Sequence, residues 1–263
     1  TWALYPNGDF VVSGNGVVGY PAINHEVMLA AKNLIIEEGI TGIVETAFFG
    51  VWENVESITI PASVEIIGEG AFAGLPYLTD FVVDENNENY TSYNGALFNK
   101  DITELITYNC GSKETSYTIP DGVTDVATGA FIYALNLTEV IIPDSVVNIG
   151  ESVFLECVNL QTVKIGSGVK YIGEGIFDGI NSLTDVTYNG IEDQWNNIDI
   201  GGNDVLEALI RFEPDGCNHA DADKDGLCDE CKEAYEVNNG SFGENVTWIL
   251  YSDGKLVISG EGK

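Results

Sequence analysis

The densest group of potential metal ligands lies between residues 217 and 231, near the end of the sequence. Three thiolates and one imidazole make a tetrahedral zinc set, and two of the cysteines have the Cys-x-x-Cys spacing that is common in structural sites. The predicted zinc ligands are Cys217, His219, Cys228 and Cys231. Because four protein ligands leave no open coordination position, such a metal would stiffen the chain and not catalyse a reaction.

The same segment also begins like a calcium-binding loop. Alternate carboxylates before a turning glycine, here Gly226, wrap a hard cation in EF-hand loops. The predicted calcium ligands are Asp221, Asp223, Asp225 and Asp229. The EF-hand pattern is incomplete, since Lys232 stands at the twelfth position where a bidentate glutamate is required. Oxygen and thiolate ligands seldom serve one ion, so zinc, calcium and a metal-free acidic linker with a redox-labile Cys228–Cys231 pair all stay open.

Other motifs give catalysis little support. The two histidines, His25 and His219, are far apart in the sequence. The sequence has no Gly-x-Ser-x-Gly elbow, His-Glu-x-x-His motif or phosphate loop. Paired carboxylates suit glycoside hydrolysis, but with 42 acidic residues such pairs arise by chance. We therefore expect no enzyme, with a carbohydrate-active enzyme component as a remote alternative.

The composition excludes several classes of partner. The 263 residues are 44% hydrophobic, enough for a sizeable core, and the formal net charge is −32. That charge repels nucleic acid and anionic membranes. No apolar run approaches the ~18 residues of a membrane span, so we expect no direct membrane insertion. The sequence opens on Thr1-Trp2 without a signal peptide, which is typical of the interior of a longer folded protein.

A repeat of about 23 residues is the strongest pattern in the sequence. Each unit has an apolar strand pattern, as in Val55–Pro61, then a second short apolar stretch, a small residue and a phenylalanine. These phenylalanines are Phe48, Phe72, Phe131, Phe154 and Phe177. Such a unit cannot bury its apolar side alone, so the units are expected to stack around one core, with the phenylalanines in one interior column. Glycines at 68, 150 and 173 are expected to permit the turn that follows each second strand.

The repeat resembles the BspA-type leucine-rich repeats of bacterial surface proteins. The resemblance rests on Ile58–Val64 with Ile67–Phe72, which recur as Ile142–Val146 and Ile149–Phe154. It covers roughly residues 32 to 212, and Tyr188–Gly202 resembles the closing segment of such arrays. The resemblance implies adhesion or ligand binding at the cell exterior, without a defined chemistry.

One interval of the repeat is too long for a single coil. Phe72 and Phe131 are 59 residues apart. We interpret this interval as one enlarged coil that carries an asparagine-rich surface loop, Asp84–Tyr90, and an extra hairpin at Gly95–Lys100. Elsewhere in the coils, Cys110 and Cys157 are interpreted as small buried hydrophobes.

A second, longer repeat encloses the first, because Thr1–Gly16 aligns without a gap to Thr247–Gly262. Each copy is predicted to be a hairpin around Asn7-Gly8 or Asp253-Gly254, dipeptides that suit a two-residue turn. The fold class is therefore a leucine-rich-repeat-like solenoid, mainly β with short helical or turn segments. Its expected divisions are a hairpin cap at 1–24, a solenoid with its end cap at 25–214, a Cys/His/Asp-rich linker at 215–240, and the first hairpin of a following module at 241–263.

One outward position per coil is expected to align into a strip on the strand face. The predicted ligand-binding strip is Ile35, Thr59, Val82, Thr118, Ile141, Lys164 and Thr187. Its apolar, hydroxyl and cationic members suit a protein or glycan of a host or neighbouring cell, although β-branched residues are also simply good strand formers. Aromatic residues that could stack on sugars are Trp52, Tyr77, Tyr90, Tyr93 and Trp195. We expect an extracellular, non-catalytic adhesion module, with a structural spacer as the alternative.

Overall fold

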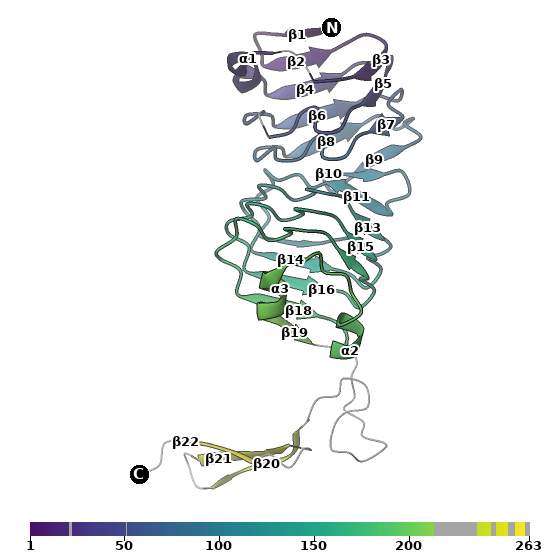
Figure 1. Ribbon diagram of the computed structural model, residues 1–263. Coiled ribbons are helices and arrows are strands. Elements are labelled where there is room, and N and C mark those ends of the chain that lie inside the picture. Colours follow the sequence, from purple (N-terminus) through teal and green to yellow (C-terminus); the bar gives the residue numbers. More distant parts are fainter. Residues whose placement is uncertain (21–22, 51, 213–235, 243–245, 252–255, 261–263) are drawn as a thin grey trace.

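The computed structural model describes residues 1–20, 23–50, 52–212, 236–242, 246–251 and 256–260. The chain from β1 to β19 winds into a β-solenoid of about nine turns, mostly strands with a few short helices (Figure 1). This is the fold class that the repeat predicts. No helix among the described residues is long and apolar enough to cross a membrane.

Parallel strands along one side of the solenoid, here called the front strands, form two sheets. Their residues alternate between buried and partly exposed because successive side chains of a strand point to opposite faces. The first sheet contains β2 (Asp9–Val12), β4 (Asn33–Ile36), β6 (Ser57–Ile60) and β8 (Asp80–Val83). The second sheet contains β12 (Ser116–Thr118), β14 (Glu139–Ile142), β16 (Thr162–Ile165), β18 (Asp185–Tyr188) and β19 (Ile210–Phe212).

Mostly shorter strands form two further sheets, here called the back strands. The first sheet contains β3 (Gly16–Val18), β5 (Ile40–Ile43) and β7 (Ile66–Ile67). The parallel strands of the second sheet are β11 (Glu104–Thr107), β13 (Asp125–Val126), β15 (Asn148–Ile149) and β17 (Tyr171–Ile172).

The glycines that follow the back strands have a different role from the predicted one. None of Gly68, Gly150 and Gly173 has a positive φ, so conformational freedom is not the reason for glycine there. A Cβ on Gly150 would lie 2.5 Å from the backbone nitrogen of Thr128, and one on Gly173 would lie 2.5 Å from that of Glu151. Glycine is therefore required because the preceding coil passes too close for any side chain.

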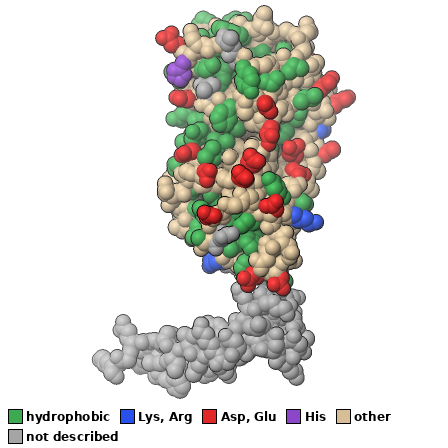
Figure 2. All heavy atoms as spheres, viewed as in Figure 1, with side chains coloured by type: hydrophobic (Ala, Val, Ile, Leu, Met, Phe, Trp, Pro, Cys, Tyr) green, Lys and Arg blue, Asp and Glu red, His purple; other side chains and the backbone are tan. Residues whose placement is uncertain are grey.

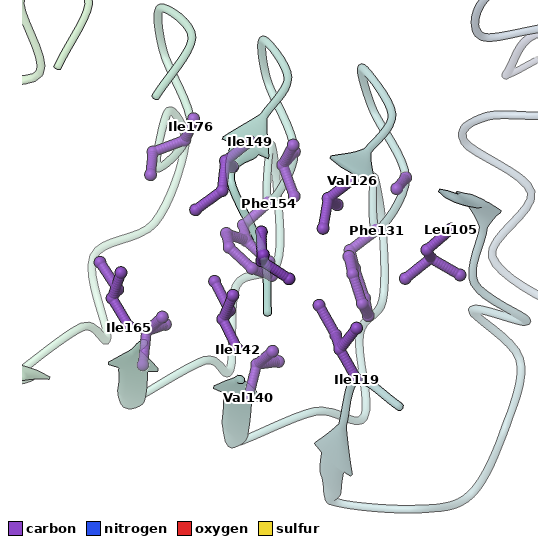
Figure 3. Close-up of a cluster of buried hydrophobic side chains, with 14 of the residues drawn as sticks. Leu105, Ile119, Val126, Phe131, Val140, Ile142, Ile149, Phe154, Ile165 and Ile176 are labelled. Atoms are coloured by element: carbon purple, nitrogen blue, oxygen red, sulfur yellow. The ribbon is translucent and has the colours of Figure 1, made fainter. Parts of the chain in front are cut away.

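The core lies between the front and back strands but is divided into two clusters, one with Phe48 and Phe72 and one with Phe131, Phe154 and Phe177, instead of the single core that the repeat predicts. Figure 3 shows Phe131 and Phe154 in the second cluster. All five phenylalanines are buried. The rings of Phe48 and Phe72 stack with centroids 5.7 Å apart, and Phe154 lies 5.2 Å from Phe131 and 5.7 Å from Phe177. Within each cluster, neighbouring coils therefore place these rings in contact, at centroid separations in the range that aromatic pairs prefer.

The enlarged coil contains the predicted extra hairpin, β9 (Tyr90–Tyr93) and β10 (Ala96–Asn99). Asn94 and Gly95 join these strands, and both have the positive φ of a two-residue turn. β10 also pairs antiparallel with β11.

Tyr108 occupies the phenylalanine position of the enlarged coil, with its ring 5.0 Å from that of Phe131. The interval from Phe72 to Phe131 therefore contains two coils, the enlarged one and a following coil with β12 and β13, and not the single enlarged coil that the sequence suggested. The spacing of 23 residues between Tyr108 and Phe131 equals that of the repeat and so predicts that Tyr108 takes the phenylalanine position. A search for phenylalanine alone misses it.

The asparagine-rich segment is only partly the surface loop that the sequence suggested. Asn87 is fully buried. Its Nδ2 donates to the carbonyl oxygens of Pro61 and Val64, and its Oδ1 accepts from the backbone N–H groups of Asn89 and Tyr90. This side chain satisfies two carbonyls of the previous coil, so Asn87 is a buried structural residue of the loop and not a surface residue.

At the first end of the solenoid, β1 (Trp2–Leu4) pairs antiparallel with β2. Residues Tyr5–Gly8 connect the two strands, with only Gly8 at positive φ, instead of the predicted two-residue turn. β2 and β3 also pair parallel with β4 and β5, so residues 1–24 contribute the first turn of the solenoid as well as a cap. Helix α1 (His25–Ala30) follows, with the Asn24 side chain accepting from Val27 N–H.

The other end of the solenoid is closed by α2 (Glu192–Trp195), α3 (Asp204–Leu209) and β19. The C-terminal copy of the long repeat forms the predicted hairpin, β21 (Val246–Tyr251) with β22 (Leu256–Gly260). A further strand that precedes the copy, β20 (Glu236–Phe242), pairs with β21 to complete a three-stranded antiparallel sheet. β20 begins inside the segment 215–240 that the sequence assigned to the linker.

Candidate functional site

The strip residues lie in register within each of the two front sheets, three in the first and four in the second, and we call these two columns together the ladder. In the first sheet Ile35 is opposite Thr59, and Thr59 is opposite Val82. In the second sheet the in-register residues are Thr118, Ile141, Lys164 and Thr187. The column continues to Val11 in the first sheet and to Arg211 in the second, two positions that the sequence analysis did not include.

Exposure varies along the ladder. Val82 is 48% exposed, and Thr118 and Lys164 are also exposed. Thr187 is only 5% exposed, which corrects its assignment to an open strip. It stands in register between Lys164 and Arg211, whose long side chains flank it.

A second outward column, two residues before the ladder in each strand, is polar and was missed from the sequence. Its members are Asp9, Asn33, Ser57, Asp80, Ser116, Glu139, Thr162 and Asp185. Neighbouring coils are joined along it, since Asn33 Nδ2 donates to Asp9 Oδ1 at 2.8 Å and Ser57 Oγ donates to Asn33 Oδ1 at 2.8 Å. In the sequence, this column could have been predicted from the polar residue that directly precedes the first inward-facing residue of each front strand.

The basic side chains of the ladder form ion pairs with carboxylates of this polar column. Lys164 Nζ lies 3.0 Å from Glu139 Oε1 on the adjacent strand, and Arg211 forms an ion pair with Asp185. The bond from Lys164 lowers the pKa of Glu139 below its ordinary value, and Ser116 Oγ adds a second bond. The cations are therefore positioned by carboxylates of the same face. Figure 2 shows that acidic side chains greatly outnumber basic ones over the visible surface.

Three ladder residues line one hollow at the ends of β14, β16 and β18. Ile141, Lys164 and Thr187 border a space of about 290 Å³ together with Asp144 and Asn189. The hollow thus combines an apolar side chain, a cation, a carboxylate and an amide, a combination that orients a mixed polar and apolar group of a ligand.

Asp144 is held in place at this hollow. Burial raises its pKa, but bonds from the Ser167 backbone N–H at 2.6 Å, the Ser167 hydroxyl at 3.0 Å and Asn189 Nδ2 at 3.0 Å outweigh burial and leave the pKa below its ordinary value. The carboxylate is therefore charged at neutral pH and fixed in orientation, as a recognition group requires.

The described residues contain no group of three or more His, Cys, Asp or Glu arranged to hold a metal ion. His25 lies exposed at the start of α1. The predicted zinc and calcium ligands between 217 and 231 lie outside the described residues, and both metal assignments stay predictions.

The structure separates the aromatic side chains considered for sugar stacking. Trp52 is 1% exposed and packs against Phe10 and Phe48, so it cannot present a face to a ligand. Trp195 is 6% exposed and packs against Tyr188 and Phe212 in the end cap. The remaining candidates are Tyr77 and Tyr93, which are exposed, and Tyr90, whose hydroxyl accepts from Ile67 N–H.

The two cysteines of the coils are buried and free. The Cys157 thiol donates to the carbonyl oxygen of Phe131, and burial raises its pKa to about 12. Burial also raises the pKa of Cys110 well above its ordinary value. Both thiols are therefore protonated and inert at neutral pH, as expected of small hydrophobes and not of nucleophiles.

Comparison with known proteins gives one sequence family and several solved structures. The profile described as the BspA type leucine rich repeat region matches in six copies, over residues 28–110 and 100–199. No curated protein sequence matches the chain.

The structure of the pneumococcal vaccine antigen PcpA is similar at 22% identity with a TM-score of 0.61, over 68% of this chain and 50% of that one. The chain therefore spans half of that structure, and the likeness is one of fold. A leucine-rich repeat protein from Eubacterium ventriosum matches at 20% identity with a TM-score of 0.42, over 72% of this chain and 76% of that one. A leucine-rich cell surface protein from Faecalibacterium prausnitzii matches at 22% identity with a TM-score of 0.43, over 67% and 65%. Because the family profile covers more than half of its length, this chain belongs to the BspA-type leucine-rich-repeat family.

Proposed function

We propose that this chain is a non-catalytic binding module of an extracellular bacterial surface protein, and that its ladder binds a protein ligand. The observation that carries the proposal is the hollow at the ladder, where Ile141 and Lys164 lie beside the fixed carboxylate of Asp144. Aligned strands keep these groups at constant spacing, which lowers the entropic cost of ordering them on binding.

A protein ligand suits this face better than a glycan. Neither outward column of the front strands contains an aromatic residue, the side chain that would stack on a sugar ring. The two tryptophans considered for that role are buried. The apolar, cationic and anionic groups at the hollow, Ile141, Lys164 and Asp144, instead suit a protein surface of mixed apolar and charged side chains.

The test is an array of purified host extracellular proteins, with glycans on the same array, probed with the full chain and two charge-matched variants. Lys164→Glu alters the hollow, while Lys170→Glu makes the same charge change at an exposed position before β17. We expect Lys164→Glu to weaken binding of the captured protein at least ~10-fold and Lys170→Glu to leave it nearly unchanged. Equal effects of the two variants, or capture of glycans only, would contradict the proposal.

A structural spacer is the second candidate, and the repeated terminal hairpin favours it. Two equivalent hairpins in one chain are suited to tandem arrays of modules that give length. Reproducible absence of binding across the array, with the protein folded, would support the spacer over the binding module.

A further inference from the structure

The two copies of the terminal hairpin have the same strand register. In the first copy Trp2 is opposite Val12 and Leu4 is opposite Phe10. In the second copy Trp248 is opposite Ile258 and Leu250 is opposite Leu256. Adding 246 to each residue of the first pairing gives the second, so β1 and β21 are structurally equivalent strands.

The copies differ on the outer side of these strands. β21 lies between β22 and β20, whereas β1 is the edge strand of its sheet among the described residues. β20 pairs antiparallel with β21, with Gly240 opposite Trp248 and Asn238 opposite Leu250. The position that β20 occupies beside β21 therefore has no described strand beside β1.

The backbone of β1 is suited to receive such a strand. Thr1 and Tyr5 form hydrogen bonds with Ser13 and Asp9 on the β2 side. Because antiparallel strands alternate the direction of their backbone groups, the N–H and C=O of Trp2 and Leu4 point away from β2. In the second copy, the equivalent residues Trp248 and Leu250 are the ones opposite β20 residues.

Apart from its short length, β1 lacks the features that normally protect an edge. Its three residues, Trp2–Leu4, include no charge, no proline and no bulge, whereas exposed edge strands usually carry one of these to prevent pairing with another chain. The Trp2 side chain is 42% exposed and stacks on Phe10 at 5.4 Å, so an apolar surface borders the edge.

We propose that the outer edge of β1 is a strand-docking site, and that its occupant is a copy of the β20 segment, Glu236–Phe242. The docked strand places its glycine, equivalent to Gly240, opposite Trp2 and its asparagine, equivalent to Asn238, opposite Leu4. The docked strand then becomes the edge of the first front sheet, and β1 is paired on both of its sides. Successive modules each begin with such a paired strand instead of an open edge. This inference concerns the assembly of modules and is independent of ligand binding by the ladder.

The experiment adds residues 236–246 of the sequence directly before Thr1 of the full chain, because Thr1 is equivalent to Thr247. Amide hydrogen exchange of Trp2 and Leu4 is then measured in the extended and unextended chains. We expect at least ~10-fold slower exchange at both residues in the extended chain, since a paired amide must open before it exchanges.

Two controls make the test decisive. An extension with a shuffled sequence should leave the exchange at Trp2 and Leu4 unchanged, and an extension carrying Gly240→Pro should lose protection because proline has no N–H to pair with Trp2. The unextended chain holds an internal comparison, since Trp248 and Leu250 should already exchange slowly beside β20. Equal exchange in the β20 and shuffled extensions, or fast exchange at Trp248 and Leu250, would overturn the proposal.

Discussion

At the scale of single residues, the acidic surface places one carboxyl in an unfavourable setting. Glu104 lies half-buried at the start of β11, near Asp125 and Glu69. Burial, and then repulsion by these two carboxylates, raises its pKa above the ordinary value of 4.5. A raised carboxyl pKa means that folding favours the protonated form, so the associated stability is present below the ordinary pKa and is lost as the pH rises through the pKa of the folded state.

Glu104→Gln should therefore raise the melting temperature at pH 7, and the gain should disappear below about pH 4, where the wild-type carboxyl is protonated. We expect a gain of less than about 1 kcal/mol, because water screens a half-exposed charge. Thermal unfolding of both proteins across this pH range gives the measurement. Glu88→Gln, an exposed position, makes the same change in net charge and serves as the control; a gain from Glu104→Gln that persisted at acidic pH would refute the assigned cause.

At the scale of elements, the stacked rings divide between two core clusters that meet at β10. Alternate side chains of this strand face opposite ways, since Ala96 and Phe98 belong to the cluster that ends at Leu206, while Leu97 belongs to the cluster that begins at Phe10. The hairpin in the enlarged coil therefore acts as a partition between two stretches of the solenoid. In a solenoid, each coil is stabilised mainly by its immediate neighbours.

Phe154→Ala should cost about 3–5 kcal/mol, because it opens a cavity between the rings of Phe131 and Phe177. The loss should remain local, with faster amide exchange in the coils of those two residues and little change around Phe48, which lies in the other cluster. Val158→Ala, at a position that is 44% exposed, is the control and should have a small effect. Equal acceleration of exchange in both clusters would show that the solenoid unfolds as a single unit.

At the scale of the whole molecule, the net charge of −32 opposes the compact state through self-repulsion. The two described ion pairs, Lys164 with Glu139 and Arg211 with Asp185, lie on the front face and compensate little of it. Much of the repulsion acts between exposed carboxylates, which salt screens over distances near 10 Å at about 0.1 M.

The melting temperature should therefore increase as sodium chloride is raised from about 10 mM to about 150 mM, because screening weakens repulsion more than it weakens two ion pairs. Thermal unfolding at constant pH is the measurement. Lys164→Gln removes one ion pair, and its salt dependence should remain of the same sign and similar size. A melting temperature that fell with added salt would mean that attractive pairs, and not repulsion, dominate the electrostatics of folding.

The period of the sequence determined the solenoid, the phenylalanine column and the register of the ladder. A fixed spacing between apolar residues forces equivalent positions of successive coils to stack, so these features follow from order along the chain. The family followed from the same residues, since its profile matches over residues 28–199. The extra hairpin could also be predicted from the sequence, because its turn depends on the local backbone conformation of Asn94 and Gly95.

Only the tertiary structure decided which polar and small side chains the stacked coils enclose. Asn87 is buried because it reaches carbonyls of Pro61 and Val64, more than 20 residues earlier in the chain. Gly150 is required because Thr128 of the preceding coil passes beside it. The burial of Thr187 and the pairing of β20 with β21 likewise depend on neighbouring strands. Periodicity specifies which positions stack, whereas the distance between backbones and the satisfaction of buried polar groups are set by contacts between coils.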